Sequence, residues 1–186
     1  LSVHASDIDG DGDQDVVSAS ISGNTVDFHR NGDATSGDGD GSTWTDIRIT
    51  TTAQGASSVS AADIDGDSDQ DVIVASNFGN TVSLYRNGDS TSGGGSGQTW
   101  AETDITTDVD SPLSVDIADI DGDGDPDVIS ASVGDDTIAF HRNGDDNSGT
   151  GQGMVWTETD IATDALGATS VYAADIDGDG DQDIAS

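Results

Sequence analysis

The chain has 186 residues and a formal net charge of −34 at pH 7, from 38 acidic residues and four arginines, with no lysine. It has no cysteine, which excludes disulfide bonds, and its acidity makes nucleic acids and anionic membranes unsuitable partners because both carry negative charge. With 32% hydrophobic and 4% aromatic residues, the composition alone favours disorder, so a folded chain requires a regular apolar pattern.

The chain is built on a repeat of 56 residues that runs without insertions or deletions. A nine-residue motif, DIDGDGDQD in its first copy, opens at Asp7, Asp63, Asp119 and Asp175. A tryptophan and an arginine recur with the same spacing. We therefore expect three full units and the first two strands of a fourth, at residues 1–56, 57–112, 113–168 and 169–186.

The second unit shows the expected elements in chain order. Residues 58–63 (SVSAAD) predict a short strand, and residues 71–76 (DVIVAS) form a continuous apolar run, typical of a strand buried on both sides. Residues 80–87 (NTVSLYRN) alternate, and residues 99–107 (TWAETDITT) predict a more polar edge strand. Turn signals separate all four, and no segment has helical periodicity. Four antiparallel strands per unit predict an all-β fold, a β-propeller of four-stranded blades.

Within the third predicted strand, alternation assigns each side chain to one side of the sheet. Val82 and Leu84 are expected to point inward, and Ser83 and Tyr85 outward. Gly/Ser-rich stretches follow this strand in each unit and differ most between units. They suit either a variable binding rim or, as we favour, slack connections. These stretches are residues 34–43, 90–99 and 146–155.

The aspartate-rich motif has the spacing of a calcium-binding loop. Side chains at its first, third, fifth and ninth positions and the carbonyl of its seventh provide oxygen ligands, which Ca²⁺ prefers, and glycine at the sixth permits a sharp turn. We expect about one ion per loop, up to four, with the cations cancelling the repulsion among the carboxylates. The candidate metal-site residues are Asp7, Asp9, Asp11, Asp13 and Asp15; Asp63, Asp65, Asp67, Asp69 and Asp71; Asp119, Asp121, Asp123, Asp125 and Asp127; and Asp175, Asp177, Asp179, Asp181 and Asp183.

Two loops depart from this pattern, and two other calcium motifs fail to match it. Ser68 replaces the sixth-position glycine of the second loop, where a positive φ would be strained, and Pro126 should stiffen the third. An EF-hand would need glutamate at its twelfth position, where the first loop has Ser18, and helices rather than strands on its flanks. The nonapeptide β-helix is excluded by the length of the repeat.

The segments DIDGDGDQDVVSAS, DIDGDSDQDVIVAS and DIDGDGDPDVISAS, each after a strand beginning Ser-Val, resemble the FG-GAP/VCBS repeat family. The resemblance covers the whole chain and implies blades of a calcium-binding propeller related to the integrin α-subunit head. It also implies that each loop joins the first and second strands of a blade. The Phe-Gly and Gly-Ala-Pro signatures are not in their usual places, since Ser-Ala-Ser or Val-Ala-Ser stands where Gly-Ala-Pro would. The bacterial and archaeal branch is therefore the better match.

The remaining chemically active residues favour structural roles. His29 and His141 occupy one repeat position and predict strand-surface residues. His4 occupies the most variable position of the first strand, shared with Ser60, Asp116 and Tyr172; these four could shape a site near the propeller axis, although drift on a solvated face is the simpler interpretation. We expect the repeated arginines to pair with carboxylates of neighbouring blades and the tryptophans to pack between blades. These residues are Arg30, Arg86 and Arg142, and Trp44, Trp100 and Trp156.

The function expected from these features is that of an extracellular, calcium-stabilised repeat module with a structural, adhesive or self-assembling role. The alternatives are a carbohydrate-binding module, or the non-catalytic propeller part of a larger polysaccharide-active enzyme; we expect no catalysis by this chain. The expected partners are calcium, and either other copies of the chain, through open blade edges, or an extracellular glycan or protein.

The expected location is extracellular or at the cell surface, with any export signal removed or upstream. The four loops account for 20 of the 38 acidic residues, and the remainder still outnumber the arginines, which indicates a saline habitat. No apolar run reaches 18 residues, so no membrane insertion is expected. Two copies arranged head to tail would supply unequal numbers of inner and outer strand pairs, so we favour a piece of a longer array.

Overall fold

The fold is all-β, as predicted. The computed structural model describes residues 1–32, 39–88, 95–144 and 151–186. Its strands are β1 (Ser2–Ser6), β2 (Asp15–Ser20), β3 (Thr25–Asn31), β4 (Trp44–Thr50), β5 (Ala56–Ala62), β6 (Asp71–Ser76), β7 (Thr81–Asn87), β8 (Trp100–Thr106), β9 (Pro112–Ala118), β10 (Asp127–Ser132), β11 (Thr137–Asn143), β12 (Trp156–Ala162), β13 (Tyr172–Ala174) and β14 (Asp183–Ala185).

The strands form three four-stranded antiparallel sheets, each in chain order, and a two-stranded hairpin. We call β1–β4 blade 1, β5–β8 blade 2, β9–β12 blade 3, and β13–β14 half-blade 4. The four strands predicted for the second unit coincide with β5 to β8, with ends shifted by at most two residues. Each Asp-rich loop joins the first and second strands of its blade, as the family resemblance implied.

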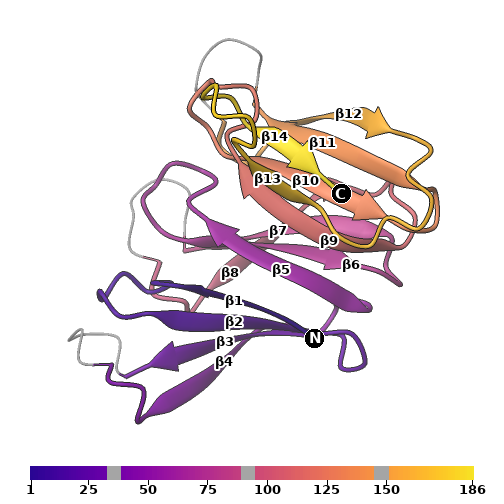
Figure 1. Cartoon of the computed structure of the whole chain (residues 1–186). Helices are drawn as coiled ribbons and strands as arrows, with labels where there is room; N and C mark the ends of the chain where they lie inside the picture. The colour runs from indigo at the N-terminus through magenta and orange to yellow at the C-terminus, as the bar shows by residue number, and fades with distance from the viewer. Residues whose placement is uncertain (33–38, 89–94, 145–150) are drawn as a thin grey trace.

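The sheets stack face to face in an open array, and Figure 1 shows blade 1 and half-blade 4 on opposite sides of blade 2. The first strands lie closest together: β1 contacts β5, β5 contacts β9, and β9 contacts β13. The outer strands separate, since β8 and β12 touch only slightly. Blades that converge at their first strands and diverge outward have the arrangement of a propeller that is not closed.

Blades 2 and 3 each have two apolar faces because each lies between two neighbouring sheets. We call the face toward the following blade the leading face and the face toward the preceding blade the trailing face. On β7, Val82 and Leu84 pack with blade 3, whereas Tyr85 belongs to the cluster shared with blade 1. The prediction that Ser83 and Tyr85 point outward was therefore wrong, since each is 2% exposed under blade 1. Alternation was predicted correctly, but both faces of the sheet are core.

Short side chains also join the blades by hydrogen bonds at a constant sequence offset. The hydroxyl of Ser2 accepts a hydrogen bond from the backbone N–H of Val59 at 3.3 Å. Ser58 accepts the same bond from Val115. In the last pair, Ser114 accepts it from Val171. Equivalent residues thus set the register between each pair of consecutive first strands.

Candidate metal centres

Each Asp-rich loop brings three carboxylates together. They come from the first, third and ninth positions, and each group offers three oxygen atoms that lie within 4.8 Å of one another. Such groups could hold a metal ion. They are Asp7, Asp9 and Asp15; Asp63, Asp65 and Asp71; Asp119, Asp121 and Asp127; and Asp175, Asp177 and Asp183.

Backbone N–H groups and two residues of positive φ shape each loop. In the first, Gly12 N–H donates to Asp7 Oδ2 at 3.0 Å, and Gly10 and Gly12 have φ of 73° and 99°. The left-handed turn at the sixth position was predicted. The glycine at the fourth position also has a positive φ, which was not predicted although this glycine occurs in every copy of the motif. At the sixth position of the second loop, Ser68 has φ of 79°, so serine does adopt the glycine conformation there.

The aspartates at the fifth and seventh positions are not part of the three-carboxylate groups, and their side chains accept hydrogen bonds from backbone N–H groups instead. Asp11 Oδ1 accepts a hydrogen bond from Asp13 N–H at 3.0 Å. The Asp13 carboxylate accepts one from the N–H of Gly39, and Asp69 and Asp125 do the same with Gly95 and Gly151. The role predicted for the seventh position involves its main-chain carbonyl and stays a prediction. Of the Gly/Ser-rich stretches, residues 34–38, 90–94 and 146–150 lie outside the described residues.

The strongest sign of a cation is a set of buried carboxylate oxygens to which no described residue donates a hydrogen bond. The side chain of Asp9 is 0% exposed and both its oxygens belong to this set. Burial, with the negative charges of Asp15 and Asp11, raises the pKa of Asp9 to about 6. A buried carboxylate without donors is costly unless a cation compensates it, so these residues fit a hard divalent ion. The other members of the set are Asp7 Oδ1, Asp11 Oδ2, Asp67 Oδ2 and Asp123 Oδ2.

The ninth-position aspartate ties its loop to two strands. In blade 2, Asp71 is 1% exposed, and its two oxygens accept hydrogen bonds from Ile64 N–H at 3.1 Å and Asn87 N–H at 2.9 Å. Burial raises its pKa to about 7 although both bonds oppose that shift. Asp15 and Asp127 make the same pair of bonds in blades 1 and 3.

Sequence reasoning missed an asparagine that links consecutive loops. The side-chain amide of Asn87 donates to the carbonyl of Ile8 in the preceding loop at 2.8 Å and accepts from Gly97 N–H at 2.9 Å. Asn143 repeats both bonds, donating to the Ile64 carbonyl at 2.9 Å. The signal was present, because this asparagine recurs every 56 residues directly after the repeated arginine.

The arginines lie beside the loops of their own repeats. Arg30 Nε is 3.9 Å from Asp9 Oδ2, and Arg142 Nε is 2.8 Å from Asp121 Oδ2. In blade 2, burial raises the pKa of Asp65, and the charge of Arg86 opposes that shift. Pairing with carboxylates was expected, but these ion pairs are made within a repeat rather than between repeats. They offset part of the charge of each loop.

A Ser–His–acid row crosses the trailing face of blade 1. Ser18 Oγ is 2.8 Å from His29 Nε2, and His29 Nδ1 is 2.7 Å from Asp46 Oδ1. The order is that of a serine hydrolase relay. However, Ser18 lies in the middle of β2, which pairs with β1 and β3 on its two sides, so its own main chain is committed to the sheet rather than to an oxyanion.

The counterpart in blade 3 favours a structural role for this row. Ser130 Oγ is 2.9 Å from His141 Nε2, and His141 is only 1% exposed. The expectation of a surface position for His141 was therefore wrong, because blade 2 covers it. In blade 2 the row is replaced by Tyr85, whose hydroxyl donates to Glu102 at 2.9 Å. The row therefore spans the second to fourth strands in blades 1 and 3, whereas in blade 2 the corresponding contact joins only the third and fourth strands.

The remaining predicted positions have mixed outcomes. Trp100 and Trp156 pack into the interfaces between blades, as predicted, whereas Trp44 is 47% exposed.

Burial lowers the pKa of His4, and the charge of Asp116, two repeats away, opposes that shift. This interaction agrees with first strands that converge on an axis.

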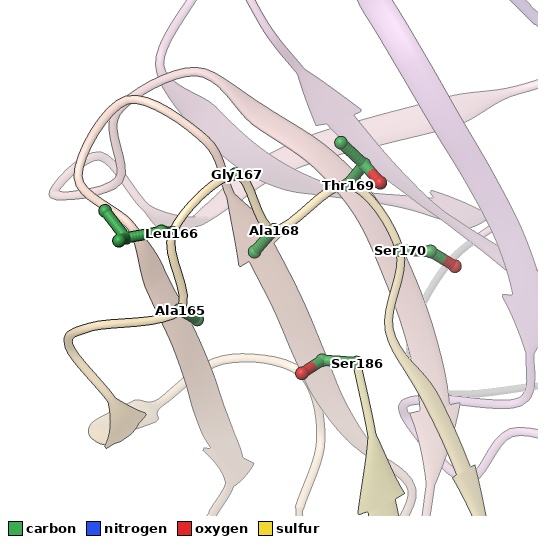
Figure 2. A pocket seen from close by; sticks show the side chains of 7 residues that line it. All are labelled: Ala165, Leu166, Gly167, Ala168, Thr169, Ser170 and Ser186. Atoms are coloured by element: carbon green, nitrogen blue, oxygen red, sulfur yellow. The ribbon is translucent and has the colours of Figure 1, made fainter.

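A hollow of about 320 Å³ lies beside half-blade 4, lined by residues 165–170 and Ser186 (Figure 2). In blade 2 the equivalent stretch binds a hairpin turn, since the carbonyls of Gln54 and Gly55 accept hydrogen bonds from Phe78 and Asn77. The hollow corresponds to the place of that turn, and its lining includes no ionisable side chain. We therefore assign no ligand to it.

We expect Ser68→Gly to stabilise blade 2. The change should relieve about 1 kcal/mol of left-handed strain, partly offset by the entropy of glycine in the unfolded chain, for a net gain of roughly 0.5 kcal/mol. The backbone N–H of residue 68 donates a hydrogen bond to Asp63 Oδ2 at 3.0 Å, and this bond should persist because it does not involve the side chain. Urea unfolding measures the change, with Gly12→Ser in the first loop as the matched reverse substitution. A loss of stability in Ser68→Gly would contradict the strain assignment.

The fold and its sites define a class: an open, all-β array of propeller blades, each with a potential metal-binding loop between its first two strands. A model of the FG-GAP-like repeat matches residues 7–74, 63–130 and 122–186. These matches cover most of the chain, which therefore belongs to the FG-GAP-like repeat family. No curated protein sequence matches the chain significantly. Among the described residues, no helix is long and apolar enough to cross a membrane.

Proposed function

We propose that this chain is an extracellular, calcium-stabilised repeat module with a structural or adhesive role. The observation that supports it best is the buried Asp9 carboxylate, which lies among other carboxylates without a hydrogen-bond donor from the described residues. FG-GAP-like repeats are typically extracellular, where calcium is abundant enough to occupy sites of modest affinity.

Calcium would act as a folding partner rather than as a catalyst. The residues that would hold it are the first, third, fifth and ninth aspartates and the seventh carbonyl of each loop. Without a cation, the carboxylates of a loop repel one another; a bound cation offsets that repulsion and holds the first strand to the second. Stability is then linked to calcium concentration, because the ion binds the folded chain in preference to the unfolded one.

A carbohydrate-binding role is the second candidate. It would use the Gly/Ser-rich stretches and the three tryptophans, and the observation that favours it is the exposure of Trp44, which is 47% exposed. Trp100 and Trp156 pack between blades, which leaves two of the three unsuited to stacking on sugars. We propose no catalytic activity for this chain, in keeping with a binding or structural module.

Calcium titration tests the proposed function. In equilibrium dialysis we expect up to four ions per chain, and in thermal unfolding a large fall in Tm with excess chelator that calcium restores and magnesium does not. The double variant Asp9→Asn/Asp11→Asn should lower the stoichiometry by one. Asp108→Asn/Asp160→Asn, which removes two exposed carboxylates outside the loops, is the charge-matched control. Unchanged calcium stoichiometry in the loop variant would refute the site assignment.

A further inference from the structure

A series of hydrogen bonds joins the Asp-rich loops of blades 1 and 2. Asp15, the ninth residue of the first loop, accepts a hydrogen bond at Oδ2 from Ile8 N–H at 3.0 Å. The Ile8 carbonyl accepts one from the Asn87 side-chain amide at 2.8 Å, and Asn87 N–H donates to Asp71 Oδ1 at 2.9 Å. Because Asp15 and Asp71 belong to different three-carboxylate groups, these bonds connect two candidate metal centres.

The same series of bonds joins blades 2 and 3, starting from the other oxygen of Asp71. Ile64 N–H donates to Asp71 Oδ2 at 3.1 Å, and the Ile64 carbonyl accepts from the Asn143 amide at 2.9 Å. Asn143 N–H in turn donates to Asp127 Oδ1 at 2.9 Å. The three loops, β1–β2, β5–β6 and β9–β10, lie at the same edge of the stack in Figure 1. The two oxygens of one carboxylate thus lead to the preceding loop and to the following loop.

Burial shields all these bonds from water. Hydrogen bonds in such surroundings are electrostatically stronger than in water, and solvent does not replace a partner that leaves. If one loop opens, the asparagine amide of the next blade therefore loses its acceptor at a cost in free energy. The residues in the series, each at most 1% exposed, are Ile8, Asp15, Ile64, Asp71, Asn87, Asp127 and Asn143.

Ile8 lies between two of the carboxylates that would bind the ion. Asp7 and Asp9 flank it in the sequence, and one oxygen of each lies within 4.8 Å of the other and of an oxygen of Asp15. The Asn87 bond holds the peptide group that joins Ile8 to Asp9, and the Ile8 side chain packs in the cluster shared by blades 1 and 2. Blade 2 therefore helps to fix the spacing of the ligands in the loop of blade 1.

We propose that Asn87 and Asn143 are positioning residues that make calcium binding in consecutive loops cooperative. This coupling rests on the proposed function, because it concerns the ions that the loops would hold. In an occupied loop, the ninth-position aspartate is fixed; it orients the asparagine of its own blade, and that asparagine orders the preceding loop. Without a cation, repulsion among the carboxylates opens a loop, so the loop is the two-state element that both sites bias. Because linkage is reciprocal, each site should raise the affinity of its neighbour by the same factor, about 10-fold.

A second set of asparagines joins the same blades without touching an Asp-rich loop. Asn24 Oδ1 accepts a hydrogen bond from Gly55 N–H at 2.8 Å, and Asn80 Oδ1 accepts one from Ser111 N–H at 3.1 Å. Both asparagines lie in turns between second and third strands, at the end of the sheet opposite to the loops. Their φ values are 54° and 55°, so glycine fits there without strain. Asn24→Gly and Asn80→Gly therefore weaken the contacts between the blades and serve as matched controls.

A calcium titration that reports each loop separately tests the coupling. The backbone amides of Gly12, Ser68 and Gly124 identify the three loops, because each donates to the first aspartate of its own loop. Their signals in ¹H–¹⁵N NMR spectra give a calcium midpoint for each loop as calcium chloride is added in concentrated salt. Removing the second site with Asp65→Asn/Asp67→Asn should raise the midpoints of Gly12 and Gly124 by about 10-fold. This variant loses two negative charges together with one divalent ion, so the formal charge of the second loop does not change.

The asparagine variants separate the two directions of coupling. Asn87→Leu keeps a branched side chain of similar size but removes the donor to the first loop. In its presence, removal of the second site should no longer shift the midpoint of Gly12, whereas the shift of Gly124 should persist. Asn143→Leu should give the reverse result, and the two glycine controls should leave both shifts in place. A residue that only stabilised the fold would change both directions alike.

The outcomes distinguish the coupling from the proposed function. Circular dichroism checks that each calcium-loaded variant is folded, and Asn87→Ser and Asn143→Ser, whose shorter side chains lack the amide, replace a leucine variant that is not. Midpoints of the first and third loops that stay unchanged when the second site is removed would overturn the coupling alone. An equal effect of Asn87→Leu on both directions would do the same. If none of the three amides responded to calcium, the proposed function would fail, and the coupling with it.

Discussion

Asp71→Ala is expected to lower the free energy of unfolding by about 3 kcal/mol in the presence of calcium, since it leaves buried donors unsatisfied and removes a metal ligand. The two donors are Ile64 N–H and Asn87 N–H, both on residues that are at most 1% exposed. Water cannot readily replace the carboxylate at such a site. Urea unfolding of the variant and of the wild-type chain measures the loss.

The effect should shrink when calcium is removed by a chelator. Burial raises the pKa of Asp71 to about 7, so the ionised carboxylate is itself unfavourable in the cation-free fold, and deleting it removes that cost. A larger loss in chelator than in calcium would contradict the assignment of Asp71 as a ligand.

Asp183 is the matched control for Asp71, at the same loop position. It accepts a hydrogen bond from Ile176 N–H at 3.0 Å, but Ile176 is 62% exposed, so water can take over that donor. Asp183→Ala should therefore cost less than about 1 kcal/mol in chelator. Equal losses in the two variants would show that burial does not govern the role of this position.

The loops and strands could be predicted because their signals are local. A period of two over six or seven residues indicates a strand, and aspartates at alternate positions next to glycines indicate a loop that folds around a cation. The positive φ of Ser68 followed from the glycine at that position in the other loops. These inferences need only a few consecutive residues and the repeat.

Whether a side chain on the trailing face is buried or exposed could not be predicted in the same way. Trp44 and Trp100 occupy one repeat position, yet Trp44 is exposed and Trp100 is packed against blade 1. Burial of His141 has the same origin. The deciding quantity is whether another blade covers the face, which is a property of the stack and not of the 56-residue unit. The asparagine contacts between loops likewise span 79 residues.

The Gly/Ser-rich stretches show the same limit. They were interpreted as slack connections, but in blade 2 the described end of the stretch is fixed by several bonds. Gly97 N–H donates to Asn87 Oδ1 at 2.9 Å, and the Gly97 carbonyl accepts from Trp100 Nε1 at 3.1 Å. Composition identified a loop, whereas the role of Gly97 depends on Phe28 of the preceding blade.

Gly97→Ala is expected to destabilise the protein by about 3 kcal/mol, from left-handed strain plus overpacking. Gly97 has φ of +68°, and a methyl group there would lie 2.2 Å from Cε1 of Phe28. The Phe28 ring is 0% exposed, so it has no solvent to move into, and the two blades would have to separate.

Gly41→Ala isolates the contribution of the neighbouring blade. Gly41 occupies the same repeat position with φ of +76°, but a methyl group there meets nothing within 4 Å. Both variants carry the same backbone strain of about 1 kcal/mol, so their difference, about 2 kcal/mol, measures the packing of blade 1 on blade 2. Adding Phe28→Ala to Gly97→Ala should then cost less than Phe28→Ala does in the wild-type chain, because the added methyl occupies part of the cavity. If Gly41→Ala and Gly97→Ala had equal free energies of unfolding in urea, the contact between blades 1 and 2 would adapt to the added methyl group at little cost. A single blade would then be the unit of folding.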